Sequence, residues 1–500
     1  MLGGKTYKYF VCFAIYPLRP YNKHMKEPVK EHKRKIVVGF ASILAGGGHN
    51  ALRDFLYQEF ENNPDYEIQK FTHSDSSYNF FNDQIFGRFS RLYTLFYNYV
   101  PNEYPALSAL TLIKECEAFI KKINPDIIIS TNFGISSAMG LIQKTLKLNF
   151  INIYAVPDYG APTKVTVPSN RYIKPDYVIV FDDATRKAIM KMLDFPKEKV
   201  LISGYVAKKE CRELIKANRK KSSTQIVAEI QNLLPTPETK SIDPIKRTVI
   251  VIGGAGGIIH KSQPLLKKIA DYQKKYPKFL DGNQFLVITG LNESFFKKLQ
   301  KRRSKAEWSN IIPIPWVDPQ VYVRLQILAE FPILVTIAPA TINELVEARC
   351  GPFLIFHSRS GQEVPIVNFA VKMNFAQYIP KSDKAISKII SGFTKTEKER
   401  FLISSEKYSS ERLVTAQELP NLIYELYDHH SNVSKRKKRH LKLDFDFSKV
   451  SPKLLISIFL MLLPSSLIFA YAQYYKQKKK IVDNRYWEAM VKQLSKFKPF

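Results

Sequence analysis

The chain has 500 residues, more than one hydrophobic core usually organises, so two folded domains with extensions are expected. Hydrophobic residues make up 45% of the sequence, which excludes a disordered chain. The formal net charge of +31 indicates a polyanionic partner, which could be nucleic acid, an anionic membrane surface or a phosphorylated substrate.

Residues 1–34 form a basic N-terminal extension. Its apolar run at 9–18 is too short to cross a bilayer and has no small-residue cleavage site. We therefore expect neither a signal peptide nor a transmembrane helix here, while a weak interfacial anchor stays open.

Residues 35–207 read as the first of two βα series. Short apolar runs (KIVVGFA, DIIIS, FINIYAV and YVIVF) alternate with helical patterns such as 52–60 and 134–146. This alternation predicts a parallel sheet covered by helices on both faces. The first run leads into ILAGGGHNALRDF, where three glycines precede His49. By itself, that stretch predicts only a tight strand-to-helix turn.

Residues 208–246 are rich in Lys, Ser and Pro and show little periodicity, so they are interpreted as a linker. The alternation restarts over residues 247–395 with TVIVIGGAGG, FLVITG, ILVTIAP and GPFLIFH. Two such series predict an α/β protein of two Rossmann-like domains that face a cleft between the carboxyl ends of their sheets.

A second glycine cluster follows the strand TVIVI. Glycines at this place let backbone N–H groups approach a phosphate, although a plain strand-to-helix turn explains them about equally well. Neither a GxGxxG with a ribose-binding acid nor a GxxxxGK[ST] motif is present, which disfavours a dinucleotide oxidoreductase and a P-loop ATPase. The cluster comprises Gly253, Gly254, Gly256 and Gly257.

Residues 336–363 place a strand, a helix beginning near Thr341, a second strand and a Gly-Gln-Glu loop in succession. Glu344 is expected in the first turn of that helix, where a carboxylate commonly compensates the helix charge. The same carboxylate could instead accept two hydrogen bonds from ribose hydroxyls.

The C-terminal part is predicted as a helical region at 396–434, a basic stretch at 435–453, a transmembrane or re-entrant helix at 454–475 and a basic tail at 476–500. Residues 454–472 carry no charge over a length that crosses a bilayer core. Their basic flanks are nearly symmetrical, so the positive-inside rule leaves the orientation open. We expect a membrane protein with both α/β domains in the cytosol.

Taken together, the blocks resemble the inverting glycosyltransferases of the GT-B fold. Within that fold they are most similar to the family of monogalactosyldiacylglycerol synthases and processive diacylglycerol glucosyltransferases, and more distantly to MurG. The order of the blocks is more specific than any one of them. They are GGGH (46–49), residues 175–210, VIGGAGG (251–257), IPIPWVDPQVYVRLQ (312–326) and TINELVEARCGPFLIFHSRSGQE (341–363).

The resemblance implies a role for each candidate site residue. His49 is the candidate base or a diphosphate contact, and the glycine cluster at 253–257 faces the phosphates of a UDP-sugar. On the acceptor side lie Gly47, Gly48 and Asp158. The remaining residues implied to contact the nucleotide sugar are Trp316 and Val317 beside the uracil, Thr341 and Glu344 near the ribose, and Gln362 and Glu363 toward the sugar hydroxyls.

The implied activity is transfer of a hexose from UDP-galactose or UDP-glucose to diacylglycerol or another lipid, with no metal or other cofactor. Anionic membrane lipids are the expected partners of the basic runs, and the absence of a nucleic-acid motif argues against nucleic acid. One departure is Leu44, where the family has an aspartate. A catalytically degenerate paralogue that acts as a membrane-bound nucleotide-sugar-binding or scaffold protein is therefore the alternative.

Overall fold

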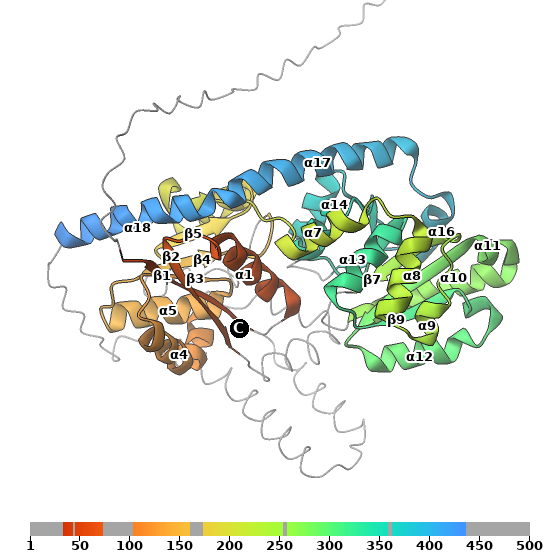
Figure 1. Ribbon diagram of the computed structural model, residues 1–500, viewed down its shortest axis with the longest axis horizontal. Helices are drawn as coiled ribbons and strands as arrows, with labels where there is room; N and C mark the ends of the chain where they lie inside the picture. The colour runs from red at the N-terminus through yellow and green to blue at the C-terminus, as the bar shows by residue number, and fades with distance from the viewer. Residues whose placement is uncertain are drawn as a thin grey trace, which may run out of the picture. The chain divides into compact units, whose positions relative to one another are not determined.

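The computed structural model describes residues 34–43, 46–73, 104–160, 174–253, 258–358 and 363–436 (Figure 1). Residues 1–33 of the basic N-terminal extension, Leu44, residues 437–453 of the basic stretch 435–453 and the candidate membrane segment 454–475 lie outside these residues. No helix in the described part of the chain is long and apolar enough to cross a membrane.

The first sheet has six parallel strands in the order β2-β1-β3-β4-β5-β6. This confirms the parallel sheet that the alternating pattern predicts. Alternate residues of one strand enter opposite cores, since Phe40 packs in one apolar cluster and Ala41 in another. Both faces are therefore buried, as parallel sheets require. The strands are β1 (Ile36–Ile43), β2 (Tyr66–His73), β3 (Ile127–Ser130), β4 (Ile151–Ala155), β5 (Tyr177–Val180) and β6 (Val200–Ile202).

Helices cover this sheet on its two faces. Leu52 and Phe55 of α1 join one core, whereas Cys116 of α4 and Met139 of α5 join the other. Side chains cap two of these helices at their first turns: Asn132 accepts N–H bonds of α5, and Asp182 accepts one of α6. The helices are α1 (Gly46–Phe60), α4 (Tyr104–Ile123), α5 (Phe133–Thr145) and α6 (Asp183–Leu193).

The second sheet is also parallel and six-stranded, in the order β12-β11-β10-β7-β8-β9. Along β7, Val249 and Val251 pack on one face while Ile250 and Ile252 pack on the other. The strands are β7 (Arg247–Ile252), β8 (Asn283–Gly290), β9 (Ile311–Pro315), β10 (Phe331–Leu334), β11 (Phe353–Ile355) and β12 (Ala376–Tyr378).

Two layers of helices enclose the second sheet. Leu265 of α10, Phe295 of α12 and Ile389 of α16 share one core, and Val321 of α13 and Ile342 of α14 belong to the other. The helices are α10 (Gln263–Lys275), α11 (Pro277–Gly282), α12 (Glu293–Arg303), α13 (Pro319–Leu328), α14 (Pro339–Glu347), α15 (Val364–Lys372) and α16 (Ser382–Ser391).

The connecting segment 208–246 holds more regular structure than its composition predicts. It forms α7 (Lys209–Asn218), α8 (Ser223–Leu233) and α9 (Pro237–Lys240), of which α7 and α8 pack against α13. Ser222 and Thr236 each begin a helix with a reciprocal capping box, and this local chemistry outweighs the weak periodicity. After the second sheet, α17 (Lys395–Gln417) and α18 (Leu419–Arg436) follow, and the Tyr66 hydroxyl of β2 donates to the backbone oxygen of Pro420 in α18.

Candidate functional site

The chain changes direction in the first sheet between β1 and β3. After β1 it adds β2 on one side, and it then crosses to add β3 on the other. Ligands of doubly wound sheets bind outside the carboxyl ends of the strands at such a switch point. The two segments that leave this edge carry His49, in the first turns of α1, and Thr131, directly after β3.

His49 is held across the switch point by the backbone. Its Nδ1 lies 2.6 Å from the backbone oxygen of Thr131, and the Thr131 hydroxyl donates to the His49 backbone oxygen at 2.9 Å. A carbonyl oxygen can only accept, so Nδ1 carries the proton and Nε2 keeps its lone pair. Burial lowers the pKa of His49, partly opposed by this hydrogen bond. The imidazole is therefore a neutral base whose tautomer is fixed.

The glycines before His49 are in the first turn of α1. A Cβ built on Gly48 meets no atom within 4 Å, so packing within the described chain does not account for a glycine there. Asp158, the other residue predicted on the acceptor side, follows β4 and is partly buried. Gly47 lies within α1, directly before Gly48.

The second sheet has its switch point between β7 and β10. Gly253 follows β7 directly, and a Cβ there would lie 2.5 Å from the Cα of Ile259. Close packing against the 3-10 helix at 258–262 thus explains this glycine without a ligand. The other predicted phosphate contacts, Gly254, Gly256 and Gly257, lie outside the described residues.

Helix α14 begins at this switch point without a side-chain cap. Its N-cap is Ala338, which has no side-chain oxygen, and its first residue is Pro339, so no side-chain cap from the described residues accepts the first N–H groups of the helix. In contrast, Asp318 caps the neighbouring α13 with a 2.9 Å bond to the Val321 N–H. An uncapped helix N-terminus is a suitable place for an anion, and Thr341 lies in its first turn.

Glu344 lies deeper in α14 than the sequence indicates. The helix begins at Pro339 rather than near Thr341, because proline is favoured at the first helical position, and this puts Glu344 in the second turn. A carboxylate compensates the positive end of the helix dipole only within about the first turn, so this effect does not explain Glu344. Glu344 is partly buried, and no hydrogen bond or ion pair joins its carboxylate to a described residue. Burial raises its pKa to about 7, with Lys208 acting in the opposite direction.

Glu363 and Gln362 were both predicted to reach toward a sugar. Glu363 is 6% exposed and binds the turn after β10, where it accepts from the Thr336 hydroxyl and, at 3.3 Å, from the Ile337 N–H. The carboxylate of Glu363 therefore holds the backbone of the turn after β10 in place. Gln362 lies outside the described residues.

The two residues predicted beside the uracil follow the edge strand β9. Trp316 is 57% exposed, which is unusual for a tryptophan, whereas Val317 packs partly against the core. Asp318, the next residue, caps α13 and so fixes where this short segment ends.

Contacts between the two α/β domains bring their switch points to the same region. Helix α1 lies beside α14, and Tyr159, which follows β4, donates a 3.0 Å hydrogen bond to the Asn343 side-chain oxygen in α14. The hydroxyl of Tyr408 in α17 donates to the same oxygen at 2.9 Å. The guanidinium of Arg412 lies over the rings of Tyr159 and Tyr408. Asn343 and Glu344 are adjacent, so this buried cluster positions the helix that carries Glu344.

Sequence reasoning missed several polar groups at the carboxyl edges. His357, after β11, has its Nδ1 3.0 Å from the backbone oxygen of Val335, so it repeats the arrangement of His49 in the second domain. His73 at the end of β2 pairs with Glu115 of α4. The position of each histidine at a strand end was the available signal, although the partners are distant in sequence.

No protein-family model and no curated protein matches the sequence. Solved structures are similar in fold. A protein described as a UDP-N-acetylglucosamine 2-epimerase from Listeria monocytogenes has a TM-score of 0.52 at 11% identity, over 79% of this chain and 98% of its own. The alpha,alpha-trehalose 6-phosphate synthase of Burkholderia multivorans has a TM-score of 0.51 at 9% identity, over 81% and 100%. MnaA of S. aureus, solved with UDP, has a TM-score of 0.50 at 12% identity, over 77% and 96%.

The chain has the GT-B fold. At these identities the likeness establishes the arrangement of two Rossmann-like domains, which confirms the predicted fold class for the described residues.

Proposed function

We propose that the protein is a UDP-sugar-dependent inverting hexosyltransferase with a lipid acceptor. The observation that carries this proposal is the pairing of two switch points in one GT-B fold. One of them holds His49 as a neutral base, and the other holds Glu344 as a carboxylate that binds no described residue.

The donor is assigned to the second domain. The diphosphate would bind at the uncapped start of α14 and at the glycine turn after Gly253, where backbone N–H groups stabilise negative charge. Glu344 would accept hydrogen bonds from the ribose hydroxyls, and the segment at Trp316 would hold the uracil. Two of the fold neighbours are named for UDP or a UDP-sugar, which agrees with this assignment.

The chemical step is assigned to His49. Its Nε2 takes the proton of the acceptor hydroxyl, and the hydroxyl oxygen forms a bond to the anomeric carbon from the face opposite the diphosphate. The bond from that carbon to the diphosphate oxygen breaks with its electron pair, so UDP leaves and the configuration inverts. Neither step uses a metal ion, because N–H groups supply the stabilisation of the leaving group.

The assignment of a lipid acceptor rests on the sequence. The uncharged segment 454–472 and its basic flanks are what a membrane-bound enzyme needs to reach a lipid such as diacylglycerol, with both domains on the cytosolic side. Anionic lipids would attract the flanks.

Incubation of the full chain in diacylglycerol vesicles with radiolabelled UDP-galactose or UDP-glucose tests the proposal. We expect label in the lipid phase, and a loss of at least about 100-fold for His49→Gln, because general bases typically contribute that much. His429→Gln, which changes an exposed histidine of α18, is the control.

A second candidate function follows from Leu44, which replaces the aspartate of the resembled family. UDP binding without transfer to any lipid would favour a membrane-bound nucleotide-sugar-binding protein over the transferase.

A further inference from the structure

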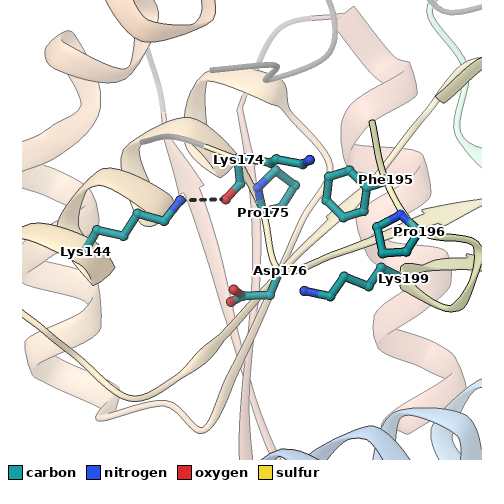
Figure 2. A pocket seen from close by; sticks show the side chains of 7 residues that line it. All are labelled: Lys144, Lys174, Pro175, Asp176, Phe195, Pro196 and Lys199. Atoms are coloured by element: carbon teal, nitrogen blue, oxygen red, sulfur yellow. Dashed lines mark hydrogen bonds between the residues drawn. The ribbon is translucent and has the colours of Figure 1, made fainter. Parts of the chain in front are cut away.

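Lys208 lies where the chain leaves the first α/β domain. It is the N-cap residue of α7, the first helix of the connecting segment. Its side chain is 29% exposed, and its Nζ lies 3.4 Å from the Oδ2 of Asp54 in α1. By contrast, Lys144 in the pocket at the amino ends of β5 and β6 donates to the backbone oxygen of Lys174 at 3.1 Å and so stays within the first domain (Figure 2). Lys208 differs because its charge also acts on a carboxylate of the second domain.

That second carboxylate belongs to Glu344. Its helix, α14, packs against both α1 and α7. Burial raises the pKa of Glu344 to about 7, and the positive charge of Lys208 opposes this shift. The same ammonium therefore acts on one carboxylate in each domain.

The two carboxylates depend on Lys208 to different degrees. The Oδ1 of Asp54 accepts from Arg53 at 2.6 and 3.0 Å, and the Nζ of Lys70 lies 3.6 Å from it. Asp54 thus keeps two other cations when Lys208 is removed. Glu344 forms no ion pair with a described residue, so the loss of Lys208 should affect Glu344 more.

The other ionisable side chains that interact with Glu344 are uncharged at neutral pH. They come from the segment after β6 (Tyr205), from α7 (Cys211) and from α13 (Tyr322). Burial raises the pKa of the Cys211 thiol to about 12 and holds the pKa of both tyrosines well above the usual range. They therefore stay neutral over the pH range in which Glu344 titrates.

Charged groups of the remaining neighbouring elements act elsewhere. Helix α17 also packs against α14, and its Arg412 lies over the ring of Tyr408. On α14 itself, Glu347 is one turn further along, and its charge acts on Arg219. Within the described chain, Lys208 is the charged group that opposes the effect of burial on α14.

We propose that Lys208 is a positioning residue of the nucleotide site, whose ammonium acts on both Asp54 and Glu344 and keeps the Glu344 carboxylate ionised for a ribose. An ionised carboxylate only accepts, so it can receive both ribose hydroxyls, whereas its protonated form also donates. This inference rests on the proposed function, which assigns Glu344 to the ribose.

UDP titrations of the full chain across a pH series provide the first test. The pH at which UDP affinity has fallen by half should rise by about one unit in Lys208→Gln, because the carboxylate loses an opposite charge. It should fall in Asp54→Asn, because Lys208 is then no longer paired with a competing carboxylate. The ionisation of UDP is the same for every variant, so differences between variants report on the protein.

Lys70→Gln is the matched control, since it also removes an ammonium beside Asp54. We expect the midpoint of the unmodified chain. Equal midpoints in Lys208→Gln and Lys70→Gln, or shifts of the same sign in Lys208→Gln and Asp54→Asn, would overturn the proposal.

Chemical unfolding across the same pH series tests Lys208 without UDP. The gain in stability from Glu344→Gln should keep rising to a pH about one unit higher when Lys208→Gln is also present, because an acid with a higher folded pKa loses stability over a wider range. Lys70→Gln should leave that profile unchanged. Absence of UDP binding at every pH would count against the proposed function, whereas an unchanged profile in Lys208→Gln would overturn the role of Lys208.

Discussion

Burial acts with opposite consequences on the two titratable residues of the candidate site. It lowers the pKa of His49 and raises that of Glu344, and in both cases the neutral form is favoured. For His49 the neutral form is the one that can accept a proton. For Glu344, the raised pKa means that keeping the carboxylate ionised lowers the free energy of unfolding. This is expected of a residue kept for a ligand rather than for stability.

Glu344→Gln should therefore stabilise the fold at high pH. An acid whose folded pKa is raised gives up stability as the pH rises from its unfolded value through the folded value of about 7. We expect Glu344→Gln to gain about 1–3 kcal/mol at about pH 8 and nothing at about pH 4, measured by chemical unfolding at both values. An equal or lower stability at the higher pH would contradict this explanation of the shifted pKa.

At the scale of elements, the first turn of α1 and the turn after β7 both contain glycines, for different reasons. Gly253 is required because a Cβ would collide with Ile259, whereas open space surrounds the Cβ position of Gly48. Of these two glycines, only Gly48 has open space beside it through which a ligand could approach the backbone.

Gly48→Ala should therefore separate stability from activity. We expect it to leave the free energy of unfolding unchanged or raise it by up to about 1 kcal/mol, since alanine favours helix, while transfer activity falls. Gly253→Ala should destabilise the fold by about 1–3 kcal/mol. Unfolding curves and transfer rates for both variants check this. Full activity in a stable Gly48→Ala variant would argue against ligand approach at α1.

The strand-helix alternation could be predicted from sequence because buried parallel strands appear as short apolar runs. The helices of residues 208–246 could not, since capping boxes and contacts with α13 stabilise them more than their own periodicity does. His49 was predicted from the resemblance of its GGGH block to the GT-B glycosyltransferases, since by itself the stretch predicts only a turn. The contacts of Glu363 with Thr336 and Ile337 were not, because they depend on tertiary packing across about thirty residues.

At the scale of the whole molecule, one apolar core runs through both α/β domains. It includes Ile129 of the first sheet, Ile250 of the second and Phe401 of α17. Within it, the Asn343 oxygen accepts two tyrosine hydroxyls from different parts of the chain. The described domains should unfold together because they share this core.

Asn343→Ala should weaken both the fold and the donor site. Loss of the shared acceptor should cost about 2–4 kcal/mol, and the displaced α14 should bind UDP less tightly. Asn218→Ala, which removes a buried side-chain amide that donates to the backbone oxygen of Leu214 within α7, should cost stability and leave UDP affinity unchanged. Calorimetric melting and UDP titration of both variants test this. Equal UDP affinity in the two would contradict a positioning role for Asn343.

Equilibrium titration of the full chain with UDP, followed by isothermal calorimetry, tests the central claim most directly. We expect saturable binding that weakens at least about tenfold in Glu344→Gln, since charge-assisted bonds to the ribose hydroxyls are lost although the fold is intact. Binding should also weaken as the pH falls below about 7, where Glu344 takes up a proton. Absence of UDP binding, or the same affinity in Glu344→Gln, would contradict a nucleotide-sugar site at the second switch point.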